Sequence, residues 1–232
     1  MEATGIGSRK MSEFLKGVRA ELPILLGVAP LGMIYGVLAA GAGLTPFQAQ
    51  ATSSVIFAGS AQFMFVQLVE LGTPALVMVL TGFIVNLRHA LYSASLAPQM
   101  THLSPLWKLL LSYLLTDEAY AITVMRYRMR DASPHKHFFF LGSGLALWFC
   151  WQAATAAGIF LGAQVPPAWG LDFTLALTFI ALAVPAIDDR PSLLAAASAG
   201  LTALLAWGLP YKLGLILAAL VGIAIGLWSE RV

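Results

Sequence analysis

The stretch that decides the fold is residues 74–98, PALVMVLTGFIVNLRHALYSASLAP. This run is long enough to cross a bilayer as a helix, for which roughly 20 mostly apolar residues suffice. The polar letters NLRH interrupt it near its middle, so Arg88 lies near the predicted midplane of the membrane. An unpaired charge there costs at least roughly 2.5–3.5 kcal/mol on insertion scales. We therefore expect a buried partner or a substrate to compensate Arg88.

The composition of the whole chain agrees with a membrane protein. Of the 232 residues, 59% are hydrophobic and only 10% are charged, whereas a soluble domain carries about 25% charged residues. The chain therefore lacks the polar groups to cover its own surface, and lipid must cover much of it. Cys150 is the single cysteine, which excludes an internal disulfide or a cysteine metal cluster.

Apolar runs between Pro, Gly and charged positions predict an all-α, polytopic transmembrane helical bundle of seven or eight spans. The eight candidate segments are 23–42, 48–71, 74–98, 104–126, 138–162, 172–187, 192–208 and 211–228. The sixth and seventh are short, so they are either short helices or two halves of a re-entrant element. Discontinuous helices and an internal repeat stay open. Residues 1–21 are expected to form a cytoplasmic N-terminal segment, and residues 22–232 a single transmembrane transport domain.

The basic residues predict the orientation of these spans. With the N-terminus in the cytoplasm, ten Lys and Arg residues fall on the inner side and two on the outer side, as the positive-inside rule requires. The inner residues are Arg9, Lys10, Lys16, Arg19, Arg126, Arg128, Arg130, Lys136, Arg190 and Arg231, and the outer ones are Lys108 and Lys212. We therefore expect a multi-pass protein with a cytoplasmic N-terminus.

Gly59, Ser60 and Gln62 form a polar group inside segment 48–71. Close helix packing is the simpler explanation for the small residues. A buried amide such as Gln62, however, needs several hydrogen-bond partners, and a helix can break at Gly59-Ser60. Unwound backbone at mid-membrane binds anionic groups in transporters. We therefore predict that these three residues lie near a bound substrate.

Asn86, Arg88 and His89 are the candidate donors of segment 74–98. Asn86 and His89 are three residues apart and share one helix face. The planar guanidinium of Arg88 matches the geometry of a carboxylate. Arg88 is thus predicted either to form a structural salt bridge or to bind the carboxylate of a substrate, with Asn86 and His89 beside it.

Asp117 and Glu118 supply two acids in the middle of segment 104–126. Adjacent residues of a helix point about 100° apart, so only one of them can fully face Arg88. Which one does so is left open by the sequence. The other acid is a candidate proton site, because burial favours the neutral carboxyl, or it binds the ammonium group of a substrate.

The sequence contains no motif of an enzyme, a cofactor site or a metal site. A nucleotide-binding loop, a Ser-His-Asp array, a zinc motif and a haem ligand pair are all missing. His135 and His137 lie two residues apart in the basic loop 126–137, but no cysteine or carboxylate cluster accompanies them. We expect no catalytic residues, cofactor, metal or nucleic acid, and we expect the loop to face anionic lipid headgroups.

Three motifs, in this order, resemble the AzlC family: FAGSAQF at 57–63, NLRHALYS at 86–93 and TDEAY at 116–120. The resemblance covers residues 14–160, and the tail after about residue 165 is similar only in hydropathy. AzlC proteins are the large subunits of bacterial branched-chain amino acid exporters of the YgaZ and BrnF type. The resemblance implies export of leucine, isoleucine and valine, with methionine as a further candidate, across the bacterial inner membrane. It also implies a small AzlD-type membrane subunit, similar to YgaH or BrnE, as partner.

These observations together predict a secondary transporter coupled to a proton or ion gradient. The alternatives are a passive amino acid facilitator, an intramembrane enzyme that uses Asp117 or His89, and a membrane subunit that transports nothing itself. Opposite charges at the midplane fit a carrier better than an open pore. Assembly into a higher oligomer is open as well.

Overall fold

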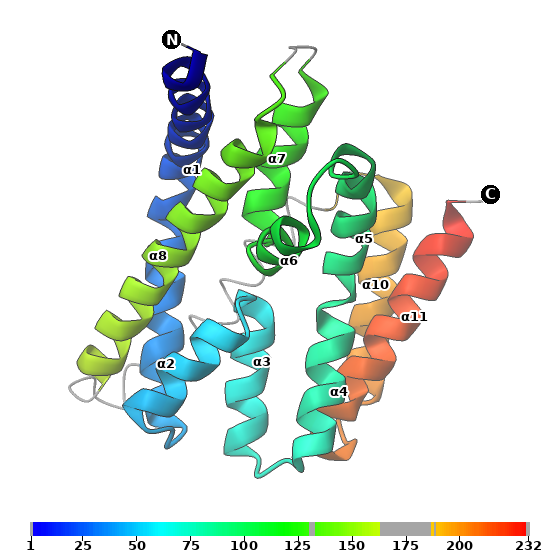
Figure 1. Cartoon of the computed structure of the whole chain (residues 1–232). Coiled ribbons are helices and arrows are strands. Elements are labelled where there is room, and N and C mark those ends of the chain that lie inside the picture. The colour runs from blue at the N-terminus through cyan, green and yellow to red at the C-terminus, as the bar shows by residue number, and fades with distance from the viewer. Residues whose placement is uncertain (1, 130–132, 163–186, 188, 231–232) are drawn as a thin grey trace. The chain divides into compact units, whose positions relative to one another are not determined.

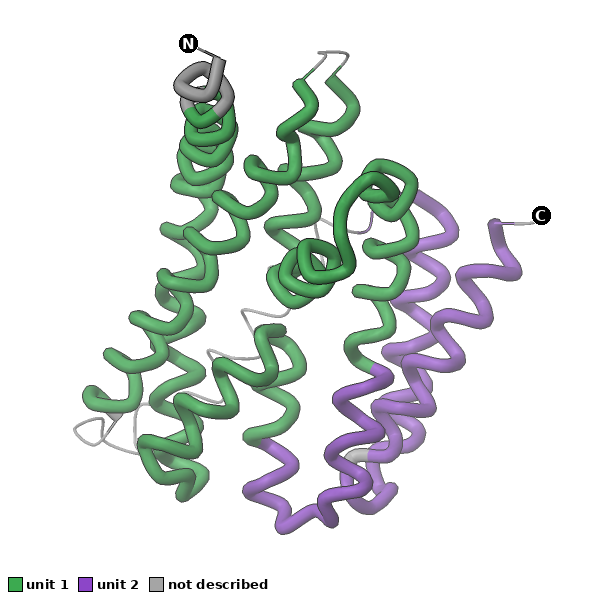
Figure 2. Tube along the Cα trace, in the orientation of Figure 1, with its two compact units in different colours: residues 1–66, 85–165 green, residues 67–84, 166–232 purple. Residues whose placement is uncertain are grey.

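The computed structural model describes residues 2–129, 133–162, 187 and 189–230 (Figure 1). These residues form helices, turns and short connections without any β-strand, so the all-α prediction is confirmed. Most of the predicted segment 172–187 lies outside the described residues. The chain divides into two compact units, residues 1–66 with 85–165 and residues 67–84 with 166–232 (Figure 2). This division concerns packing, and one transport domain over residues 22–232 stays a prediction.

Two long helices, α1 (Glu2–Gly41) and α8 (Lys136–Gly162), pack against each other in the first unit. They run in the same direction, because Gly17 of α1 meets Phe139 of α8, and Gly36 further along α1 meets Thr155. This parallel pairing agrees with the predicted first and fifth spans, which cross the membrane in the same sense. Helix α1 also continues without a break through the expected boundary at residues 21–22.

Glycines set the distance between α1 and α8. A Cβ on Gly36 would overlap the backbone carbonyl of Thr155, and a Cβ on Gly158 would overlap that of Met33. The same reciprocal arrangement occurs nearer the start of both helices, at Gly17. Small residues allow helix backbones in membranes to approach closely and gain van der Waals contact. The α1–α8 pair is therefore a tightly packed scaffold.

The next three predicted segments are each built from two helices instead of one. The pairs are α2 (Pro46–Val55) with α3 (Gly59–Glu70), α4 (Ala75–Val85) with α5 (Leu87–Leu96), and α6 (Pro105–Tyr113) with α7 (Asp117–Arg128). A 3-10 turn, η1 (Ala97–Gln99), follows α5. The breaks fall at residues 56–58, 86 and 114–116. The sequence left discontinuous helices open, and residues 46–128 of the described chain contain three of them.

Local signals explain where two of these helices begin. Thr45 caps α2 in a capping box with Gln48, and Pro46 occupies the first helical position, where its missing N–H costs nothing. Thr116 caps α7, because its hydroxyl accepts a hydrogen bond from the backbone N–H of Ala119 at 3.3 Å. Such caps satisfy N–H groups that the first helical turn leaves unpaired. The cap at Thr116 fixes the start of α7 at the polar motif.

The second unit contains α4 together with α10 (Arg190–Leu205), η4 (Pro210–Lys212) and α11 (Leu213–Ser229). Helices α10 and α11 are antiparallel, because Gly214 lies against Ala206 at one end and Gly226 against Ala195 at the other. Asp189 caps α10 by accepting a 2.7 Å hydrogen bond from the N–H of Ser192. The predicted segments 192–208 and 211–228 thus correspond to a helical hairpin.

The helices carry apolar side chains on their outer surfaces. Three helical stretches are long and apolar enough to cross a membrane, Arg9–Gly41, Ala75–Gln99 and Lys136–Leu161, and α10 and α11 are shorter apolar helices. Large apolar residues such as Leu106 and Trp207 are 76% and 85% exposed. Soluble proteins rarely expose contiguous apolar surface of this kind. The molecule is an all-α membrane protein.

Candidate functional site

The three helix breaks hold the three polar motifs singled out in the sequence. Ser60 is the second residue of α3, Arg88 is the second residue of α5, and Asp117 is the first residue of α7. The first turn of each helix has N–H groups without intrahelical partners and a partial positive charge. All three candidate side chains therefore stand at helix N-termini inside the first unit.

Arg88 connects these three helix starts. Its Nη2 donates a hydrogen bond to Ser60 Oγ at 2.5 Å, and its Nη1 lies 2.6 Å from Asp117 Oδ2. Of the two acids that the sequence offered, Asp117 is thus the one that pairs with Arg88. The two charged side chains are 32% and 38% exposed, so the pair is open on one side.

Several polar atoms around this pair have unused hydrogen-bonding capacity. Arg88 Nε, Asp117 Oδ1 and Asn86 Oδ1 are each buried and find no hydrogen-bond partner among the described residues. Asn86 forms the break between α4 and α5, and its side chain does not cap α5. An unused donor on Arg88 and an unused acceptor on Asp117 therefore belong to one ion pair, and Asn86, two residues before Arg88, carries a second unused acceptor. Such a set complements a ligand that carries both a carboxylate and an ammonium group.

Aromatic rings hold α5 against α7 next to the pair. Tyr92 stacks on Tyr120, with ring centroids 4.3 Å apart and planes 12° from parallel. The hydroxyl of Tyr120 makes a 3.0 Å hydrogen bond with Ser95. The ring of His89 packs edge-on against Tyr92 at 5.9 Å. His89 thus lies on the same helix as Arg88, within the aromatic cluster.

A mostly apolar cavity of about 350 Å³ adjoins the same elements. Its walls include Ser93, Leu96, Met100, Leu111, Leu115 and Phe140. Ser93 is one turn after His89 on α5, and Leu115 lies in the break just before Asp117. The volume is at the small end of ligand pockets, which span roughly 300–1,000 Å³.

Comparison with known sequences identifies the family, since the AzlC protein family matches residues 23–165. The chain belongs to the AzlC family. An uncharacterized membrane protein of Archaeoglobus fulgidus is 29% identical over 229 residues, which cover 95% of this chain and 97% of the relative. The inner membrane protein YgaZ of Escherichia coli is 25% identical over 186 residues, 78% of this chain and 76% of YgaZ. An uncharacterized membrane protein of Helicobacter pylori is 29% identical over 178 residues, 74% and 76% of the two chains. No solved structure matches the chain.

In this AzlC protein, Gln62 stabilises the first helix break through hydrogen bonds. It is fully buried, donates to the carbonyls of Ser53, at 3.1 Å, and Ile56, and accepts a 3.1 Å bond from the indole N–H of Trp151. Ser53 and Ile56 lie at the end of α2, where helical carbonyls lack partners. Gly59 faces the same indole, because a Cβ there would lie 3.2 Å from Trp151 Cη2. The structure therefore separates Gly59 and Gln62, which face α8, from Ser60, which contacts Arg88.

Glu118 does not pair with Arg88 in the AzlC chain. The groups that act on its carboxyl include Thr116 and its own backbone at the start of α7. Glu118 also acts electrostatically on Glu21 of α1. The two neighbouring acids thus have different surroundings, as their 100° separation on the helix requires.

Sequence reasoning missed the polar residues of α8. Gln152 Oε1 accepts hydrogen bonds from Gln50 at 2.6 Å and from Ser54 at 3.0 Å, and Gln152 Nε2 donates to the Ser53 carbonyl at 3.2 Å. Ser53 also bonds to Thr155 at 3.1 Å. An amide in the middle of an apolar run was the available signal, the same one that drew attention to Gln62.

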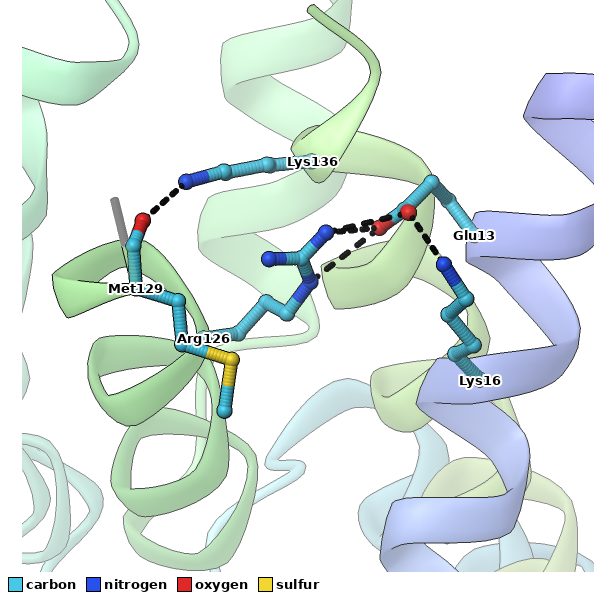
Figure 3. A network of polar contacts seen from close by, with 5 residues as sticks. All are labelled: Glu13, Lys16, Arg126, Met129 and Lys136. Atoms are coloured by element: carbon cyan, nitrogen blue, oxygen red, sulfur yellow. Dashed lines mark hydrogen bonds and ion pairs between the residues drawn. The ribbon is translucent and has the colours of Figure 1, made fainter. Parts of the chain in front are cut away.

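A separate ion-pair network joins α1 to the end of α7 (Figure 3). Arg126 donates to both oxygens of Glu13 at 2.8–3.2 Å, and Lys16 contacts the same carboxylate at 2.9 Å. Arg126 and Glu13 are only 5% and 4% exposed. The expectation that the basic loop faces lipid headgroups is therefore wrong for Arg126, because a buried acid of α1 binds it.

The described residues contain no group of three or more His, Cys, Asp and Glu side chains that could hold a metal ion. The rings of His102 and His135 lie 6.0 and 6.2 Å from the ring of His137, which also packs against Trp107 at 5.1 Å. These histidines form part of an aromatic cluster.

Proposed function

We propose that this AzlC-family protein exports branched-chain amino acids across the inner membrane by secondary transport coupled to a proton or another ion. The observation that carries the proposal is the Arg88 cluster at three helix N-termini. It has an unused donor, Arg88 Nε, and unused acceptors on its ion-pair partner Asp117 and on Asn86, two residues before Arg88. An amino acid zwitterion supplies the matching acceptor and donor.

The proposed binding geometry follows from the charges of the cluster. The substrate carboxylate binds at Arg88 and at the first turns of α3 and α5, where helix N-termini favour an anion. The substrate ammonium binds at Asp117 Oδ1 and Asn86 Oδ1. Because Arg88 already bonds to Ser60 and Asp117, substrate binding exchanges partners within the cluster instead of burying a new unpaired charge.

The apolar cavity beside α5 and α6 would take the branched side chain. Leu96, Leu111, Leu115 and Phe140 line it, and its volume of about 350 Å³ leaves room for an aliphatic chain. Burying a Leu or Val side chain contributes roughly 1.5–3 kcal/mol. A larger residue at Leu111 should reduce leucine affinity more than alanine affinity.

Localisation and partner are part of the same proposal. The basic residues support an N-terminus in the cytoplasm, and the relative YgaZ is named an inner membrane protein. A small AzlD-type subunit is the proposed partner on the basis of the family. The protein needs no cofactor and performs no covalent chemistry in this proposal.

Transport in inside-out vesicles tests the function. Vesicles that contain the chain, with and without an AzlD-type subunit, receive labelled leucine or valine and an imposed pH gradient. The wild type should accumulate both amino acids, and Arg88→Ala should abolish the accumulation. Arg128→Ala is the matched control, because Arg128 is exposed at the end of α7.

Two other results would replace the proposal. Flux that follows the amino acid gradient alone would make the protein a facilitator. Absence of flux for every neutral amino acid, in the presence of the partner, would leave a subunit that transports nothing itself.

A further inference from the structure

Glu21 is a buried carboxyl that the sequence placed in the N-terminal segment. It is fully buried in α1, and its Oε2 accepts a 2.7 Å hydrogen bond from the hydroxyl of Ser143 on α8. Its other oxygen, Oε1, is also buried and has no hydrogen-bond partner among the described residues. An ionised carboxylate in such a place lacks the hydrogen bonds that would replace its water.

The other buried acid of α1 shows what a charged carboxylate requires. Glu13, two turns earlier, receives Arg126 and Lys16 as cationic partners. Glu21 receives the Ser143 hydroxyl, and the charged group that acts on it is Glu118, a second acid. The two acids of this helix therefore have different surroundings: Glu13 belongs to an ion pair, whereas Glu21 has a serine hydroxyl and the electrostatic influence of a second acid.

The helices around Glu21 offer no cation to it within the described part of the chain. Helix α2 has no charged residue, and α8 contributes Ser143, with the weakly polar Cys150 against the carbonyl of Leu25. On α7, Asp117 is bonded to Arg88, and both of these groups act on Glu118. Arg126, eight residues further along α7, is engaged by Glu13.

We propose that Glu21 and Glu118 form a proton-binding site, in which Oε1 of Glu21 takes up a proton from water and later returns it to water. Glu21 is fully buried with one oxygen unpartnered, and Glu118 acts on it as a like charge. Both carboxyls therefore cannot ionise without a large cost, so the pair holds one proton. Ser143 occupies Oε2, which leaves Oε1 as the protonated atom. No other bond is made or broken.

This site would couple the proton to the substrate, a step that rests on the proposed function. Glu118 follows Asp117 in the first turn of α7, and Asp117 holds Arg88. Loss of the proton places a second negative charge beside that turn. This charge alters the electrostatic interaction between Arg88 and Asp117, where the amino acid would bind.

Infrared titration of the purified full-length chain tests proton binding without any transport. The carbonyl band of a protonated carboxylic acid should be present near neutral pH and disappear on alkaline titration. Glu21→Gln, which keeps an acceptor for Ser143, should lose or displace this band. Glu70→Gln, at an exposed position of α3, should keep it. A band that is the same in Glu21→Gln and in the wild type would overturn the proposal.

Two further variants keep the test decisive if Glu21→Gln does not fold. Ser143→Ala retains both carboxyls but removes the donor to Oε2, and Glu118→Gln removes the like charge. Each should displace the midpoint of the band's titration. Midpoints that stay at the wild-type value in both variants would contradict a coupled pair.

Transport then tests the coupling step separately. Glu21→Gln should lose accumulation driven by the pH gradient while it still exchanges labelled for unlabelled leucine. Full gradient-driven accumulation by Glu21→Gln would contradict the coupling role. If the wild type moves no amino acid, the proposed function fails, and the infrared result still decides whether the pair binds a proton.

Discussion

The α1–α8 pair and the three interrupted helices are both built from apolar sequence, but the first two helices are continuous and the other three are broken. Helices α1 and α8 run for 40 and 27 residues, and their glycines pack backbone against backbone. Each helix of the pairs α2–α3, α4–α5 and α6–α7 is only 9 to 12 residues long and ends at a break or at a turn. The continuous helices satisfy most of their own backbone, apart from the two hydrogen bonds that Pro23 and Pro30 of α1 cannot donate, whereas each break leaves polar groups that need other partners.

The difference shows which region can bind a ligand. Irregular backbone at membrane depth is tolerated only where protein buries it or where it lines a polar site. Gln62 and the end of α2 illustrate the first case, since their polar groups bond to each other and to Trp151. Arg88, Ser60 and Asp117 illustrate the second, because atoms of this cluster retain unused capacity.

The largest effect is expected from enlarging the close contact of α1 with α8. Gly36→Leu inserts a side chain where even a Cβ would overlap the backbone of Thr155. Overpacking costs about 1–3 kcal/mol in ordinary cores, and here no flexible side chain can move away. The variant should yield no monodisperse protein in size-exclusion chromatography. Gly27→Leu, which meets open space, should behave like the wild type, and equal behaviour of both variants would refute the tight scaffold.

The second-largest effect is expected for Gln62→Ala, and it distinguishes a structural role of Gln62 from a role in substrate binding. Gln62→Ala leaves the Trp151 indole N–H without a partner and removes one of the two hydrogen bonds to each of the Ser53 and Ile56 carbonyls, and an unsatisfied buried group costs about 1–3 kcal/mol. The melting temperature should therefore fall clearly below that of the control Gln99→Ala, an exposed position. An unchanged melting temperature with lost leucine affinity would make Gln62 a substrate ligand.

The third comparison concerns the two adjacent acids. Asp117→Asn removes the charge that holds Arg88 and should weaken leucine binding about tenfold or more, since 1.4 kcal/mol corresponds to tenfold. Glu118→Gln leaves the Arg88–Asp117 pair intact, so it should alter the pH dependence of export more than the affinity. Measured leucine affinities and pH profiles of the two variants check this. Identical behaviour of the two variants would contradict their different surroundings.

The smallest effect is expected at α10, away from the breaks. Hydrogen bonds from Ser192 hold the pKa of Asp189 below its usual range, so the ionised carboxylate is the form that caps α10. This stabilisation is present above about pH 4, the pKa of an unfolded Asp, and is lost as the pH falls through the folded value. Below about pH 4 the melting temperature of the wild type should drop slightly relative to Asp189→Asn, with leucine binding unchanged in the variant. If the melting temperatures of the wild type and of Asp189→Asn fall in parallel as the pH is lowered below about 4, the result would contradict the cap.

Sequence patterns predicted the helical class, the approximate segments and the three polar motifs, because apolar length and mid-membrane polarity are local properties. The choice between Asp117 and Glu118 was out of reach, since it depends on the rotation of α7 after the cap at Thr116. Glu21 and Gln152 were missed for a related reason. Their burial arises from the packing of α1 and α2 against α8, a long-range contact that no short window of sequence contains.

Binding of leucine and two of its analogues to the purified chain tests the central claim, that the Arg88 cluster binds an amino acid zwitterion. The analogues are 3-methylbutylamine, which lacks the carboxylate, and 4-methylpentanoate, which lacks the ammonium. Isothermal titration should give an affinity about tenfold or more lower for each analogue, because part of the buried cluster then stays unpaired. Arg88→Ala should bind none of the three measurably. Leucine binding of wild-type strength by Arg88→Ala would contradict the account.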